Sequence, residues 1–224
     1  MTSGLPWYEL TQEGISSGGT DFPTWRSADN QVIWVLNKPL LHTPGEYWNY
    51  HTGGSHLLAV IVAQATGMNL RDFANEYLFG PLDIQVGEWP QDRQGNYYGS
   101  HGLNLRARDM LKIGRLFLNN GVYNGTQVVS SSWVSESTSY IYPIFNIEGN
   151  SQGYGYQWWV DSIWGMDFFY ANGYGGQLIM IFPEENLIIV TGAAAEVNNP
   201  NGANYSGGVI SQAIYEHILP AVFH

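Results

Sequence analysis

The chain has 224 residues, with 8 basic and 19 acidic side chains and a formal net charge of −11. This charge argues against a nucleic-acid or anionic-membrane partner, because few cations are available to release the counterions of phosphate groups. The chain has no cysteine, which excludes a disulfide framework, a thiolate zinc site and a cysteine nucleophile.

The first fifty residues are punctuated by glycine and proline, and only Gln31–Leu36 within them looks like a strand or a helix. The first clear helix begins at Thr52 or Ser55 and ends before Gly67, a residue that suits a left-handed C-terminal cap. We expect its apolar face to consist of Leu57, Leu58, Ile61, Val62 and Ala65.

Three further helices are expected in the middle of the chain. Asn69 caps a short helix over Leu70–Leu78, and a longer one runs from Ala107 to Asn119. Asn124-Gly125 forms a tight turn. Residues 130–132, all serine, cap a last short helix over Trp133–Ser137.

After residue 150 the pattern changes to strands rich in aromatic and β-branched residues. The expected strands are Tyr154–Val160, Asp167–Asn172, Gln177–Phe182 and Leu187–Gly192. Pro183–Asn186 is a turn that makes the last two strands a hairpin. A final helix over Val209–Leu219, after Gly207-Gly208, is expected to cover one face of the sheet. This order predicts an α+β fold with a mostly helical and loop part, 1–150, and an antiparallel sheet with a C-terminal helix, 151–224.

The segment from Pro44 to Gly54 is one place where chemistry could be located. Tyr50 lies just ahead of the expected helix, so its hydroxyl could project into a cleft. A tyrosine serves as a base only where nearby cations lower its pKa from about 10. The alternative is a tyrosine that packs under a loop, and the spacing by itself leaves both interpretations open.

A second candidate is the glycine-rich segment from Tyr170 to Gln177, which leaves one strand and enters the next. Glycines let a backbone approach a ligand closely and can direct N–H groups at a developing oxyanion. The alternative is a glycine-rich hairpin turn or bulge.

Metal and cofactor patterns are not found in the sequence. The six histidines match no ligand spacing, since His51 and His56 are five residues apart and the others are isolated. Glu184 and Glu185 lie in a turn and are expected to be solvated. The sequence has no Gly-x-Ser-x-Gly elbow and no phosphate-binding loop. We therefore expect no metal and no cofactor.

Several segments resemble one family when they are taken together, in their order along the chain. They are Met1–Leu5, Pro44-Gly45, Tyr50-His51-Thr52, Gly67, Gly80–Ile84, Gly102–Leu105, Arg108–Met110, Lys112–Gly114, Tyr154–Trp159 and Gly173–Gln177. The chain resembles the serine β-lactamase-related hydrolases, a group that includes class C β-lactamases, penicillin-binding DD-peptidases, esterases and 6-aminohexanoate-oligomer hydrolases. The resemblance implies a β-lactamase/transpeptidase-like fold, and Tyr154–Trp159 is closer to the esterase and amide-hydrolase members.

The resemblance also implies roles for individual residues. Tyr50 falls on the catalytic tyrosine of the family's Tyr-x-Asn motif, and Thr52 takes the place of its asparagine. The substrate-binding strand motif falls on Ala171-Asn172-Gly173, where Ala171 replaces the usual lysine or histidine. Tyr174 would offer its N–H to the oxyanion hole, and Gly175 continues the same substrate-binding segment.

The family's first motif, Ser-x-x-Lys, does not occur in this chain. The residue three before Lys38 is Val35, and the residue three before Lys112 is Asp109. In the family this motif precedes the counterpart of Met1–Leu5, so the resemblance implies a domain that lacks its N-terminal part. We expect such a chain to be inactive alone, because an acyl-enzyme needs the activated serine. We also expect self-association through an exposed sheet edge.

The leading hypothesis is therefore the C-terminal portion of a serine hydrolase whose substrate is a small-molecule ester or amide. Two alternatives stay open: a non-catalytic protein that binds a small molecule or a cell-wall fragment, and a subunit that another chain completes. No apolar run reaches the ~18 residues of a membrane span. No signal peptide can be read at the N-terminus. The compartment is undetermined, although family members are often periplasmic or secreted.

Overall fold

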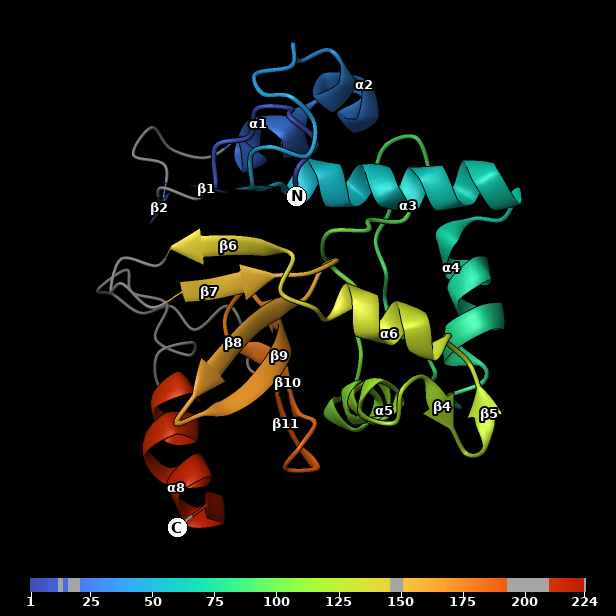
Figure 1. Ribbon diagram of the computed structural model, residues 1–224. Helices are drawn as coiled ribbons and strands as arrows, with labels where there is room; N and C mark the ends of the chain where they lie inside the picture. Colours follow the sequence, from blue (N-terminus) through green and yellow to red (C-terminus); the bar gives the residue numbers. More distant parts are fainter. Residues whose placement is uncertain (12–13, 16–20, 146–150, 193–209, 224) are drawn as a thin grey trace, which may run out of the picture. The chain divides into compact units, whose positions relative to one another are not determined.

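A computed structural model describes residues 1–11, 14–15, 21–145, 151–192 and 210–223 (Figure 1). The chain divides into two compact units. Unit 1 comprises Met1–Leu105 and Tyr140–Tyr154, and unit 2 comprises Arg106–Ser139 and Gly155–His224. Within the described residues, no helix has both the length and the apolar character that crossing a bilayer requires.

Unit 1 combines short helices with small antiparallel sheets. Strands β1, β2 and β3 form one sheet in the order β2-β1-β3, in which Leu10 pairs with Tyr50. Strands β6 and β7 pair with each other in the antiparallel direction and are the last two strands of the order β11-β10-β9-β8-β7-β6. The elements are β1 (Leu10–Thr11), β2 (Gly14–Ile15), α1 (Phe22–Ser27), α2 (Gln31–Leu36), β3 (Asn49–Tyr50), α3 (Thr52–Thr66), α4 (Leu70–Ala74), the π-helical turn η1 (Asn75–Phe79), β6 (Tyr142–Phe145) and β7 (Ser151–Tyr154).

The core of unit 1 is built from aromatic rings. Trp7, Trp25, Val35 and Tyr98 form a buried cluster, and its polar atoms are paired. The indole N–H of Trp25 donates to the carbonyl of Gln31, and the Tyr98 hydroxyl donates to the side-chain oxygen of Gln31. Such pairing removes the cost of burying these polar groups.

Helix α3 ends as the sequence predicts but buries a different face. Gly67 adopts φ 69°, and its N–H donates to the carbonyl of Ala63. The expected apolar face is correct only for Leu57, which packs against the aromatic cluster, whereas Leu58 is 49% exposed and Ile61 is 59% exposed. The buried side is polar or small: Thr52, Gly53, Ser55, His56 and Ala59. Gly53 explains this choice, since a Cβ there would lie 2.7 Å from the Trp7 ring and 2.8 Å from Val35.

Unit 2 holds the larger sheet and the helices that cover it. Strands β8–β11 are antiparallel neighbours in the order β11-β10-β9-β8. The elements are α5 (Ala107–Leu118), β4 (Val122–Tyr123), β5 (Thr126–Gln127), α6 (Ser131–Ser137), β8 (Trp159–Ile163), β9 (Met166–Gly173), β10 (Gln177–Phe182), β11 (Leu187–Thr191), helical residues 210–213, the π-helical turn η2 (Ile214–Ile218) and α8 (Leu219–Phe223).

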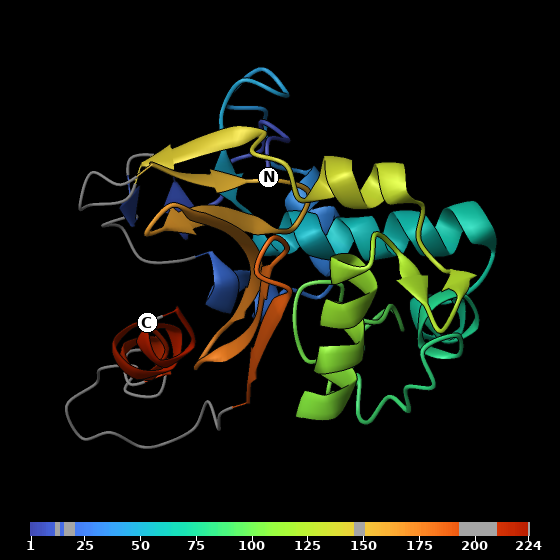
Figure 2. The ribbon, with the colours of Figure 1, turned by 60° about the horizontal axis from the view of Figure 1, so that its bottom comes forward.

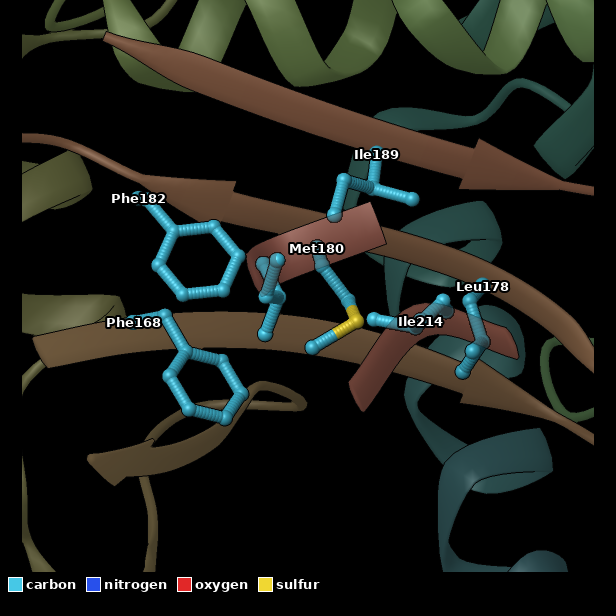
Figure 3. Close-up of a cluster of buried hydrophobic side chains, with 7 residues drawn as sticks. Phe168, Leu178, Met180, Phe182, Ile189 and Ile214 are labelled. Atoms are coloured by element: carbon cyan, nitrogen blue, oxygen red, sulfur yellow. The ribbon is translucent and has the colours of Figure 1, made fainter. Parts of the chain in front are cut away.

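Both faces of this sheet are covered within unit 2, as the two sides of the strands in Figure 2 show. Successive residues of a strand point to opposite faces. On β10, Ile179 and Ile181 join a cluster with residues of α5, whereas Met180 and Phe182 join a cluster with the C-terminal helix. Figure 3 shows Met180 directed toward Ile214 of that helix. The prediction that the last helix covers one face is thus confirmed.

Several sequence predictions for the second half hold, and some differ. The Asn124-Gly125 turn joins β4 to β5 with positive φ at both residues, and Ser130 caps α6 by accepting from the N–H of Trp133. The expected strand over 154–160 is interrupted, because the Gly155 N–H donates to the Trp158 carbonyl and closes a turn. Strand β6 and helix α1 were not anticipated. The expected helix start at 207–209 lies outside the described residues.

Candidate active site

Tyr50 is held at the junction between a strand and a helix. It is the last residue of β3, and α3 begins at Thr52. The backbone pairing of β3 with β1 fixes its position from one side. Its ring is half-buried, with centroids 6.4 Å from Trp48 and 6.5 Å from Tyr154. Tyr50 thus lies just ahead of the helix, where the sequence placed it.

The surroundings of Tyr50 favour its neutral form. Burial raises the pKa of its hydroxyl above the usual value, and the negative charge of Glu9 raises this pKa further. Within unit 1, Tyr50 is therefore a protonated phenol near neutral pH. A phenol in this state can donate a hydrogen bond, and it would need an added cation to act as a base.

Glu9 is a functional candidate that the sequence reasoning missed. One of its oxygens, Oε2, accepts the indole N–H of Trp7 at 2.5 Å and the hydroxyl of Thr52 at 2.6 Å. The backbone N–H of Thr52 donates to the same oxygen at 3.4 Å. A carboxylate is favourable at the N-terminus of a helix because orphan N–H groups and the helix dipole point there. Glu9 has no motif spacing to Tyr50, so only the fold reveals it.

His51, between the two predicted residues, caps α3. Its Nδ1 accepts the N–H of Gly54 at 2.7 Å, and its ring stacks on Trp7 with a centroid distance of 4.6 Å. The pKa of His51 is lowered to about 4, chiefly by burial and in addition by the charges of Lys38 and the N-terminal ammonium, while Asp21 opposes the shift. The ring is therefore neutral at neutral pH. The sequence suggested Thr52 or Ser55 as the cap, and the imidazole nitrogen takes that role instead.

The second candidate segment lies in unit 2, at the turn between β9 and β10. Asn172 and Gly173 are the last residues of β9 and pair with Leu178 and Gln177 of β10. The next residue, Tyr174, is 72% exposed. Gly175 adopts φ 85° and is followed by a second glycine with φ 97°, a conformation that favours glycine over any other residue.

Ala171 confirms that this strand offers no charge at its motif position. Its methyl group packs against the cluster of Trp158, Phe169, Ile179 and Ile181, on the face of the sheet that α5 covers. Position 171 is thus an apolar contact of the core. An anionic substrate group would find no cationic partner from this residue.

One Ser–His contact in unit 1 resembles a catalytic pair, but its hydrogen bond runs in the wrong direction for the histidine to act as a base. Ser100 Oγ lies 2.9 Å from His101 Nδ1, and Arg26 lies 3.0 Å from His101 Nε2. A guanidinium can only donate, so Nε2 accepts and the proton of the neutral ring is on Nδ1. Burial lowers the pKa of His101 to about 4, with Arg26 contributing to the shift. His101 therefore donates to Ser100 and cannot remove its proton.

Other charged groups are engaged in structural pairs. His56 Nε2 lies 3.0 Å from Asp92 Oδ2, and both side chains are fully buried. Lys38 contacts Asp21 at 2.6 Å, and Lys112 lies 3.5 Å from Asp109. In the part of the chain that the structure describes, no group of three or more histidine or acidic side chains is placed to hold a metal ion.

The predicted site residues thus form two groups. Tyr50 and Thr52 lie together at the start of α3 in unit 1, where Glu9 accepts hydrogen bonds from Thr52. Asn172, Gly173, Tyr174 and Gly175 lie together at the β9–β10 turn in unit 2.

Comparison with known proteins gives the family context. A family model described as Beta-lactamase matches residues 1–206. A 6-aminohexanoate-dimer hydrolase of Paenarthrobacter ureafaciens is 33% identical over 91 residues, which cover 40% of this chain and 23% of that protein. An uncharacterized protein of Alkalihalophilus pseudofirmus is 27% identical over 199 residues, covering 75% of this chain and 57% of that protein.

Solved structures agree on the fold. A provisionally named 6-aminohexanoate-dimer hydrolase of Bacillus anthracis has a TM-score of 0.64 and 29% identity, covering 85% of this chain and 50% of that one. A penicillin-binding protein of Bacillus halodurans has a TM-score of 0.64 at 14% identity, covering 96% of this chain and 70% of that one. The first relatives are longer proteins, of which this chain spans between about a quarter and just over half.

Proposed function

The chain belongs to the β-lactamase family, and we propose that its residues form part of a serine hydrolase that cleaves ester or amide bonds through a seryl acyl-enzyme. The alignments with 6-aminohexanoate-dimer hydrolases favour an amide or ester substrate over a β-lactam. Ala171 supports the same choice, because it supplies no positive charge for the carboxylate of a β-lactam.

The observation that carries this proposal is the placement of Tyr50 and Thr52 at the start of α3. Here Tyr50 is the catalytic residue and donates its phenolic proton toward the reacting group. Thr52 is a substrate-site residue beside it. Asn172, Gly173 and Gly175 form the strand segment along which the substrate lies, and the N–H of Tyr174 belongs to the oxyanion hole.

The same proposal implies that these 224 residues alone do not turn over substrate. Neither lysine follows a serine by three residues, and the structure pairs Lys38 with Asp21 and Lys112 with Asp109. Without an activated serine there is no acyl-enzyme, so a productive site requires a chain or segment that supplies one. The lack of a Ser-x-x-Lys motif in these residues also supports the alternative function, a protein that binds a ligand without a chemical step.

Turnover and binding assays on the purified chain test this proposal. We expect no hydrolysis of a p-nitrophenyl ester or a chromogenic cephalosporin, and we expect hexanamide, a simple amide, to raise the melting temperature. The variant Tyr50→Phe should weaken hexanamide binding several-fold, whereas Tyr77→Phe, an exposed tyrosine of the same unit, should not.

Two outcomes would contradict the assigned roles. One is hydrolysis that persists in Tyr50→Phe and in the presence of serine-directed inhibitors. The other is hexanamide binding that is equal in wild type and in Tyr50→Phe. Amide binding that depends on Tyr50 but never leads to hydrolysis, even after a Ser-x-x-Lys segment is added in trans, would favour the binding protein.

A further inference from the structure

We propose that the solvent-facing side of α5 is a docking surface for an acidic, amphipathic segment of another protein. Arg108, Leu111 and Arg115 form this surface, which we call the α5 arginine face. It lies in unit 2, contains none of the candidate site residues and does not depend on the proposed function.

The first observation is the concentration of positive charge in one stretch of a strongly acidic chain. Residues 93–135 contain five of the eight basic side chains and a single acidic one. The basic side chains are Arg93, Arg106, Arg108, Lys112 and Arg115. The acidic one is Asp109, which is only 7% exposed. Five positive charges and one negative charge give this stretch +4 in a chain of net charge −11, so an acidic partner is attracted here and repelled by the rest of the chain.

The second observation is the spacing of the two arginines on the helix. Arg108 and Arg115 are seven residues apart in α5, which is close to two turns, so their Cα atoms lie on the same side and about 10 Å apart along the axis. The other side of the helix, with Ile113 and Phe117, packs on the apolar cluster of the sheet. Both arginines are exposed. They therefore face solvent together.

The third observation is that neither guanidinium group has an acidic partner. Among the described residues, no carboxylate forms an ion pair with Arg108 or Arg115. Arg115 lies 5.7 Å from the centre of the Tyr123 ring, a contact that engages no carboxylate. Asp109 contacts Lys112 instead. Since a guanidinium can bind a carboxylate through two parallel hydrogen bonds, each arginine can hold one carboxylate of a partner.

Leu111 distinguishes between the classes of anionic partner. It lies between the two arginines in sequence, is 39% exposed and shares their side of the helix. An amphipathic helix with two acidic residues seven apart and a leucine between them matches all three side chains. A phosphate backbone offers no apolar group to Leu111, and its continuous charge would extend beyond the two arginines onto a chain of net charge −11.

Two matched peptides test the proposal on the purified chain by fluorescence anisotropy. One labelled peptide consists of two copies of Glu-Ala-Ala-Leu-Ala-Ala-Gln followed by a glutamate, so that its glutamates are seven residues apart. The other has glutamine in place of every glutamate. We expect the acidic peptide to bind at least tenfold more tightly at low salt. The difference should decrease as ionic strength rises, because exposed charge pairs are screened.

Variants locate the binding surface. Arg108→Gln combined with Arg115→Gln should lower the affinity for the acidic peptide at least tenfold, and each change alone should lower it about threefold, since separated sites contribute additively. Leu111→Ser should weaken binding several-fold and leave its dependence on salt unchanged. The matched control, Arg71→Gln combined with Arg93→Gln, removes two charges from unit 1 and should keep the affinity within twofold.

Three results would overturn the proposal. The first is equal binding of the two peptides, or binding of neither. The second is an unchanged affinity in the arginine variants, single or double, that circular dichroism shows to be folded. The third is displacement of the labelled peptide by an equally charged oligonucleotide at a lower concentration than by the unlabelled acidic peptide, which would assign the surface to a nucleic acid.

Discussion

At the scale of single residues, the start of α3 depends on the protonation state of one imidazole. His51 caps the helix through Nδ1, so this nitrogen must be unprotonated and the neutral ring carries its proton on Nε2. Nε2 is buried and has no hydrogen-bond partner among the described residues. A proton added to Nδ1 would abolish the cap and place a positive charge in the aromatic core beside Trp7.

The stability of the chain should therefore fall as the pH is lowered through the range from about 6.5 to about 4. Burial lowers the pKa of His51 to about 4, so the unfolded state binds the proton first and stability is lost in that window. The loss amounts to about 3 kcal/mol at most for this residue. Urea unfolding followed by circular dichroism at several pH values measures it.

The control for that prediction uses two histidines. His51→Asn keeps a capping oxygen and should remove a large part of the pH dependence. His217→Asn, an exposed position, should leave it unchanged. His101 has a pKa lowered in the same direction, so some dependence persists in His51→Asn. An unchanged slope in His51→Asn would contradict the role given to its neutral ring.

At the scale of elements, α3 is positioned by the absence of a side chain at Gly53. Alanine usually stabilises a helix by about 1 kcal/mol relative to glycine. Here the added methyl group would meet the Trp7 ring and Val35 at distances below 3.0 Å. We therefore expect Gly53→Ala to destabilise the chain by ~1–3 kcal/mol in chemical unfolding, because overpacking outweighs helix propensity.

Gln64→Ala provides the matched control for this substitution, because Gln64 is exposed on the same helix. It should be neutral or slightly stabilising. Since Gly53 precedes the cap contact at Gly54, Gly53→Ala should also weaken hexanamide binding, measured by calorimetry on the folded fraction. A Gly53→Ala chain as stable as wild type would show that α3 does not pack as tightly as the structure describes.

At the scale of the whole molecule, the net charge and the unpaired edge of the sheet have opposite effects on self-association. The net charge of −11 repels a second copy, whereas β11 ends the strand order and pairs only with β10 among the described strands. We expect self-association that strengthens when salt screens the repulsion. Sedimentation velocity at low and high ionic strength measures it, and a monomer at every salt concentration would contradict the prediction.

The sequence by itself determined the family and the α+β class. It also determined most element boundaries that are marked by a glycine, a turn dipeptide or a capping residue. Gly67, the Asn124-Gly125 turn and the Ser130 cap were predictable because each depends on backbone conformation within a few residues. The β10–β11 hairpin was predictable for the same reason, because Pro183–Asn186 marks the turn between its two strands.

Only the tertiary structure decided which face of α3 is buried and which residues surround Tyr50. The apolar periodicity of α3 pointed to Leu58 and Ile61, but close packing against Trp7 and Val35 requires the small face that contains Gly53. Glu9 and Thr52 are 43 residues apart in sequence, so their hydrogen bond follows from the chain path and no local pattern encodes it. The charge beside Tyr50 is therefore a property of the fold.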